Sequence, residues 1–185
     1  MNLGDRIKGI LVEPRSEWVK IAAEPTTVQA LYTSFIMILA AIGPVALLLS
    51  VHSLQIAVAQ YVLSLIITFV LALIVDALAP SFGGTKDFVA SLKLTAYSYT
   101  VAWLAGIFLL LGAAGGFIAL LALVYAFYTF FLGAPVLGKS SQEKTVPFTI
   151  VFVLCTFVLL VLARYVFSGM MMTPHVSAGV GMLMR

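Results

Sequence analysis

Asp76 is the residue of this sequence best suited to ion or proton chemistry, because it is a lone carboxylate within a long apolar stretch. An ionisable side chain in hydrocarbon is a candidate for an ion or proton pathway. Asp76 also lies within about one helical turn of Pro80, at the end of that stretch, where it could reach water or pair with Lys86, Lys93 or Lys139. Two roles therefore stay open, a structural ion pair and ion or proton handling.

Aromatic residues with polar groups make a second candidate site. If the chain folds back near residue 114, Trp103 becomes level with Tyr125, and Tyr99 with Tyr128. Buried hydroxyl groups need hydrogen-bond partners, so we expect a bonded cluster that serves either internal packing or a polar ligand pocket. The candidate ligand- or ion-path residues are Asp76, Tyr97, Tyr99, Trp103, Tyr125 and Tyr128.

The segment 168–185 is rich in methionine. Met170, Met171, Met172 and His175 could together bind Cu(I), which prefers thioether and imidazole ligands. Methionine also serves as an adaptable apolar surface, and that interpretation is the simpler one. We therefore predict no cofactor and keep these four residues as weak metal candidates.

No set of side chains in the sequence predicts catalysis. His52 and His175 are expected on the outer side of a membrane, Asp76 at its inner end and Cys155 in its middle, so nucleophile, base and orienting acid do not converge. The sequence has no His-Glu-x-x-His metal motif and no Gly-x-Ser-x-Gly elbow. The basic residues form no continuous patch, so neither an enzyme nor a nucleic-acid-binding protein is expected.

The elements that position these residues follow from hydropathy. The chain is 63% hydrophobic and 9% charged, with a mean hydropathy of +1.16, which predicts an integral membrane protein. Leu94 to Gly138 is uncharged over 45 residues, or about 67 Å of helix, about twice the hydrocarbon thickness of a bilayer. Pro25 to Val75 is equally too long for one crossing, and 145–163 suits a single span. We predict an all-α, polytopic bundle of five transmembrane helices within 28–167.

Charge distribution predicts the orientation. Positive charges lie before the first span and in the loops after the second and fourth spans, at Arg6, Lys8, Arg15, Lys20, Lys86, Lys93, Lys139 and Lys144. The loops around His52 and Gly115 contain no Lys or Arg. By the positive-inside rule we expect a multi-pass cell (inner) membrane protein with a cytoplasmic N-terminus and an external C-terminus.

Residues 1–25 are expected to form a cytoplasmic, amphipathic lead-in. One helix over 3–12 is predicted to end at Pro14, and a second, capped by Ser16, to run from Glu17 to Glu24 with Trp18 at headgroup level. This lead-in either anchors the first span at the membrane surface or docks a partner. Its apolar face comprises Ile7, Ile10, Leu11, Trp18 and Ile21.

Three segments carry a family resemblance: Ile10-Leu11 before Pro14 with Trp18-Val19-Lys20-Ile21; Phe82-Gly83-Gly84 with Leu94-Thr95-Ala96-Tyr97 and Trp103-Leu104-Ala105; and Leu132 to Gly138. Over about residues 7–165 the sequence resembles the bacterial-type branch of the Yip (Ypt-interacting protein) membrane family. The resemblance implies a five-span bundle with a cytoplasmic N-terminus, and a single Yip-like integral membrane domain over 1–185. The longer N-terminal region with an Asp-Leu-Tyr-Gly-Pro type motif, through which eukaryotic members are linked to Rab GTPases, is not in this sequence.

Two functions are compatible with these features. The first is a non-catalytic membrane scaffold or adaptor, whose partners are the lipid bilayer and other membrane or cytosolic proteins, or a second copy in a homo-oligomer. The alternative is a small-molecule or ion transporter or channel that uses Asp76 and the intramembrane tyrosines. The sequence contains no internal repeat of the kind that many transporters have.

Overall fold

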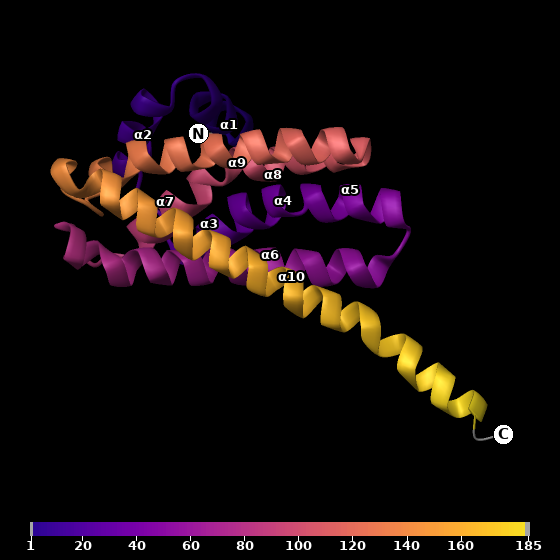
Figure 1. Ribbon diagram of the computed structural model, residues 1–185. Helices are drawn as coiled ribbons and strands as arrows, with labels where there is room; N and C mark the ends of the chain where they lie inside the picture. The colour runs from indigo at the N-terminus through magenta and orange to yellow at the C-terminus, as the bar shows by residue number, and fades with distance from the viewer. Residues whose placement is uncertain (1, 184–185) are drawn as a thin grey trace.

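The computed structural model describes residues 2–183, with side chains described for 2–165 and 168. In that part of the chain all regular elements are helices, and five are long and apolar enough to cross a membrane (Figure 1). The five spans are Val28–Val51, Leu54–Phe82, Phe88–Leu111, Ala113–Val136 and Gln142–Tyr165. The predicted fold class, an all-α polytopic membrane protein, is confirmed.

Most spans consist of more than one helical element. Before them lie α1 (Leu3–Val12) and α2 (Pro14–Ala23). The spans comprise α3 (Val28–Leu31), π-helix η1 (Tyr32–Ile36), α4 (Met37–Ala40), α5 (Ile42–Val51), α6 (Leu54–Leu78), η2 (Ala79–Phe82), α7 (Phe88–Ser98), α8 (Thr100–Ala105), η3 (Gly106–Leu111), α9 (Ala113–Val136), η4 (Gln142–Lys144) and α10 (Thr145–Leu183).

The two uncharged stretches fold back where polar or small residues interrupt them. The first turn uses His52, which is left-handed (φ 56°), and Ser53, whose hydroxyl accepts a hydrogen bond from the amide of Ile56. The second uses Gly112 (φ 60°), a conformation that glycine adopts without steric cost. Each of the long stretches therefore crosses twice, as their lengths predict.

Span one is irregular because of Pro44. A proline cannot donate the helical hydrogen bond to the residue four positions earlier, here Ala40, and α4 ends at that residue. The next turn restarts with the amide of Val45 donating to Ala41 O. Span one therefore breaks between α4 and α5, and a second irregularity, η1, lies closer to the N-terminus.

The lead-in differs from expectation in where its second helix begins. Pro14 ends α1 and is also the first residue of α2, a position where its missing N–H costs nothing. Ser16 lies within α2 and its hydroxyl donates to Glu13 O, so Ser16 is not the N-cap. The predicted cap is therefore wrong by one turn.

The fifth span lies obliquely across its neighbours and has two different faces (Figure 1). Phe148, Phe152 and Thr156 are buried against the bundle, and the ring of Phe152 stacks on Phe130 of α9 at 3.7 Å. Its other face is apolar and exposed, at Val146, Ile150, Leu154, Phe157, Val158, Val161 and Leu162. This pattern is that of a lipid-facing helix. The side chains of the weak metal candidates Met170, Met171, Met172 and His175 lie outside the described residues.

Candidate functional site

Figure 1 shows α1 and α2 on the outside of the spans, toward the end of the bundle that carries the loops α6–α7 and α9–α10. We call α1 and α2 together the N-terminal cap. Two groups of ionisable side chains lie at this end, one under the N-terminal cap around Arg6 and one between the loops around Asp76. Each joins segments that are far apart in the sequence.

Arg6 holds the N-terminal cap together. Its guanidinium is 5% exposed and bonds the Oε1 of Glu17, itself 1% exposed, at 2.6 Å, and it also pairs with Glu24. Lys20 pairs with the same Glu17 carboxylate at 3.0 Å from the exposed side. Gly9 makes room for this contact, because a Cβ there would lie 2.5 Å from Glu17 Cδ. The charges thus fix α1 against α2.

Trp18 fixes the N-terminal cap to the spans. Its indole Nε1 donates to Thr129 O at 3.0 Å, and a Cβ at Gly133 would lie 2.5 Å from Trp18 Cε2. Space beside Gly133 and an acceptor on α9 therefore place the ring inside the protein, and its expected depth at headgroup level stays a prediction. Ile10 and Ile21 are buried with it, Ile7 is half-buried, and only Leu11 is exposed.

Lys93 provides a second attachment from the spans to α2. It lies inside α7, with 7% of the residue exposed, and its ammonium donates to the backbone oxygens of Ile21 (2.9 Å) and Glu24. These carbonyls end α2, where the helix dipole favours a cation. The assignment of Lys93 to a loop is wrong, because Asp87 caps α7 and places Lys93 in its second turn.

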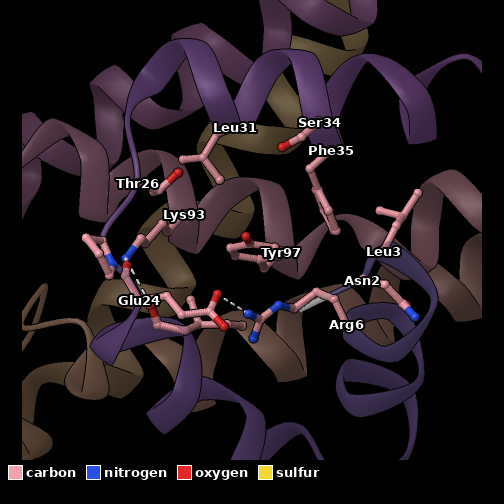
Figure 2. A pocket seen from close by; sticks show the side chains of 12 residues that line it. Asn2, Leu3, Arg6, Glu24, Thr26, Leu31, Ser34, Phe35, Lys93 and Tyr97 are labelled. Atoms are coloured by element: carbon pink, nitrogen blue, oxygen red, sulfur yellow. Dashed lines mark hydrogen bonds and ion pairs between the residues drawn. The ribbon is translucent and has the colours of Figure 1, made fainter.

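A cavity of about 250 Å³ lies between the N-terminal cap and spans one and three (Figure 2). Arg6, Glu24, Lys93 and Tyr97 line its centre, and Arg6 Cζ lies 5.5 Å from the centroid of the Tyr97 ring. Such a geometry is favourable for a cation over an aromatic face. The cavity is therefore polar and has charges of both signs.

Asp76 is the centre of the second group of ionisable side chains. It lies near the end of α6 and contacts the segments on either side of it, the loops α6–α7 and α9–α10. Its Oδ1 accepts from the amide of Asp87 (2.8 Å), from Ser91 Oγ (3.0 Å) and from Lys139 Nζ (3.4 Å). Of the three lysines considered as partners, the structure pairs Asp76 with Lys139.

The ammonium of Lys139 has no free surface. Its residue is 0% exposed, and Nζ also donates to Thr85 O (2.8 Å) and Asp87 O (2.7 Å). Burial lowers the pKa of Lys139, and the Asp76 carboxylate opposes that shift. The backbones of the two loops are also in close contact, since a Cβ at Gly84 would lie 2.3 Å from Lys139 C. The group joins the two loops.

Residues 133–140 match the Gly-x-x-x-x-Gly-Lys-Ser pattern of phosphate-binding loops. A phosphate-binding loop of that kind follows a strand and opens a helix. Here Gly133–Val136 is the end of α9, and Lys139 is already engaged by one carboxylate and two carbonyls. The match is a coincidence of sequence.

The predicted path residues do not meet in one place. The Tyr99 hydroxyl donates to Thr156 Oγ1 on α10 at 3.2 Å, whereas the Tyr125 hydroxyl donates to Leu11 O on α1 at 3.0 Å. Trp103 lies beside Tyr99, with ring centroids 6.3 Å apart, and Tyr128 is exposed. Of the six candidates, only Tyr97 lines the cavity.

Hydroxyl bonding between spans three and four is present through another residue. Thr129 Oγ1 donates to Ser98 O at 3.3 Å, directly across the hairpin. The tyrosines bond to other helices because the N-terminal cap and α10 pack on the hairpin from outside.

Arg6, Glu17, Lys93 and Lys139 were not predicted as site residues. An Asp followed by a helical apolar pattern, Asp87 to Leu94, was the signal that could have placed Lys93 inside a helix. The Arg6 pairs join residues 11 and 18 positions apart, across the Pro14 corner, and no local pattern predicts them.

Comparison with known proteins gives one match. The family model described as the Yip1 domain matches residues 8–163, which include α2, all but the last two residues of the five-span region and the group around Asp76, whereas Arg6 lies just before the match. No curated protein and no solved structure matches the chain.

Proposed function

This chain belongs to the Yip1 domain family, and we propose that it acts in its membrane as a non-catalytic scaffold or adaptor. With five helices long and apolar enough to cross a membrane, it is a multi-pass membrane protein of this family. We further propose one integral membrane domain over 1–185, with 1–25 as lead-in, the spans within 28–167 and the tail 168–185. The N-terminus is proposed to face the cytoplasm of a cell bounded by this membrane.

The observation that carries the proposal is the burial of Trp18 and Arg6. Because these side chains fix the N-terminal cap to the spans, the outer surface of α1 and α2 is held in one orientation. A surface of this kind can present binding groups without the entropy cost of ordering a loose helix. The carboxylates beneath it pair with the Arg6 guanidinium, and the Lys93 ammonium donates to backbone carbonyls, as a structural role requires.

The face offered to a partner shares only Leu11 with the apolar face that the sequence pattern indicated. Val12 and Val19 are 68% and 61% exposed, next to the exposed Leu11, Lys8 and Arg15. We propose that this outer face of the N-terminal cap contacts another membrane or cytosolic protein. Ile10, Trp18 and Ile21 take no part in that contact.

Photo-cross-linking tests this proposal. A benzophenone amino acid at Val19 should yield a discrete adduct with another protein in native membranes, because this side chain points outward. The same group at Ile21, two residues away and 1% exposed, is the matched control and should yield none. Equal labelling from both positions, or none from Val19, would contradict the scaffold proposal.

The transporter alternative makes a different prediction for Asp76. In proteoliposomes, the parent protein and Asp76→Asn should both give the ion flux of empty liposomes, because Asp76 is engaged by Lys139 and Ser91. Asp76→Asn should instead lower the free energy of unfolding by about 1–3 kcal/mol, since Lys139 stays buried without its counter-charge. Glu143→Gln, an exposed carboxylate, should change it by less than about 0.5 kcal/mol. Flux in the parent that disappears in Asp76→Asn would favour a transporter.

A further inference from the structure

The cavity under the N-terminal cap has more hydrogen-bond donors than the protein uses. Lysine has three donors and arginine five. Lys93 donates to two carbonyls and Arg6 to two carboxylates, so each keeps donors for another acceptor. Figure 2 draws bonds for both and none for the hydroxyl of Tyr97 among the residues shown. The centre of the cavity is therefore rich in donors.

The charge of the lining residues favours an anion. Two cations, Arg6 and Lys93, face one carboxylate, Glu24, which is the only acidic side chain among the lining residues. Glu17, behind Arg6, does not line the cavity. When Glu17 and its partner Lys20 are counted with the lining residues, three cations meet two carboxylates, so a ligand with one negative charge would balance the whole group. A guanidinium, an ammonium and a phenol together suit phosphate oxygens.

One wall of the cavity is the π-helix η1. Ser34 and Phe35 belong to this element and also line the cavity. The side chain of Ser34 is exposed on the surface of the protein as well. A π-helical turn is less stable than an α-helical one and occurs often at functional sites. The irregular turn in span one thus coincides with the cavity, and this observation is independent of the charges.

The depth of the cavity matches the lipid headgroup region. Lys93 and Ser34 lie five and six residues from the first residues of spans three and one, Phe88 and Val28, which is about 8–9 Å along a helix. The headgroup and interfacial layer on each side of the hydrocarbon is of similar size, about 5–8 Å. Counted from the first residues of these spans, Ser34 and Lys93 are therefore close to the expected headgroup region, and Ser34 is exposed there.

We propose that the cavity between Arg6, Lys93 and Tyr97 binds a phosphate group of a singly charged anion, as carried by an anionic phospholipid headgroup. The shared chemistry is the phosphate, and free inorganic phosphate is the other possible source. This site goes beyond the scaffold role and does not depend on it. Tyr97 donates its hydroxyl to the phosphate, and Lys93 and Arg6 supply the charge.

Native mass spectrometry of the detergent-solubilised full chain tests the site. The protein is titrated with phosphatidylglycerol, with phosphatidylcholine of the same acyl chains, and separately with inorganic phosphate as competitor. The parent should bind phosphatidylglycerol about tenfold more tightly than phosphatidylcholine. Tyr97→Phe, which keeps the ring contacts with Trp18 and Phe35, should weaken phosphatidylglycerol binding about tenfold.

Two further variants keep the test decisive. Ser34→Leu should block entry to the cavity at this exposed position and weaken phosphatidylglycerol binding without removing a charge. Tyr165→Phe, an exposed tyrosine on α10 outside the cavity, should leave binding unchanged. Competition by inorganic phosphate that Tyr97→Phe abolishes would support the anion site and assign it to soluble phosphate. Equal binding of the two lipids, or parent-like binding by both Tyr97→Phe and Ser34→Leu, would overturn the proposal.

Discussion

Arg6→Met is expected to lower the free energy of unfolding by about 3–5 kcal/mol, because it leaves the buried Glu17 carboxylate without its main partner. Glu24 loses its bond to Arg6 at the same time. The measurement is denaturant-induced unfolding in a fixed detergent. The loss should be accompanied by faster proteolysis within residues 1–25, since the same charges join α1 to α2.

Two variants separate the buried pair from surface charge. Lys20→Met removes the exposed partner of the same carboxylate, 56% exposed at its side chain, and should cost less than about 1 kcal/mol. Arg6→Met combined with Glu17→Leu should be more stable than Arg6→Met alone, because no charge stays buried without a partner. If Arg6→Met lowers the free energy of unfolding no more than Lys20→Met does, the Arg6–Glu17 pair does not hold α1 against α2.

Trp18→Ala should also lower the free energy of unfolding by about 3–5 kcal/mol, because it empties a large buried volume and removes the hydrogen bond to Thr129 O. Trp18→Phe should be intermediate, since the smaller ring still fills part of the space beside Gly133 but donates no hydrogen bond. Thermal unfolding in detergent, followed by the fluorescence of Trp103, gives the comparison.

The adjacent residue provides the control for Trp18. Val19→Ala changes an exposed position on the same helix and should alter the unfolding free energy by less than about 0.5 kcal/mol. A Trp18→Ala protein as stable as Val19→Ala would mean that the indole lies at the membrane surface, as its sequence suggested, and not against Gly133.

The spans were predictable from the sequence because hydrocarbon imposes a single strong constraint. An uncharged stretch too long for one crossing must turn, and His52-Ser53 and Gly112 lie where such turns were expected. Pro44 likewise breaks span one because it lacks a donor. These features depend on the residues themselves and on a fixed bilayer thickness.

The N-terminal cap and the charged groups were not predictable in the same way. An amphipathic helix with Trp18 and Ile21 on one face has the same pattern whether that face meets lipid or protein. That face meets protein here because Gly133, 115 residues further along the chain, leaves space for the indole of Trp18. The pairing of Asp76 with Lys139 was one of three possibilities, and the choice depends on how closely Gly84 packs against the loop after α9.

In this structure α1 and α2 pack stably against the spans and form part of the bundle. Hydrogen–deuterium exchange of the protein in lipid nanodiscs measures this directly, through the backbone amides of Glu17 to Ala23. We predict that these amides exchange as slowly as those of α7, and that Trp18→Ala raises their exchange rate by at least tenfold while α7 is unchanged. Exchange within seconds in the parent protein, as in a helix that rests loosely on the membrane, would contradict the account.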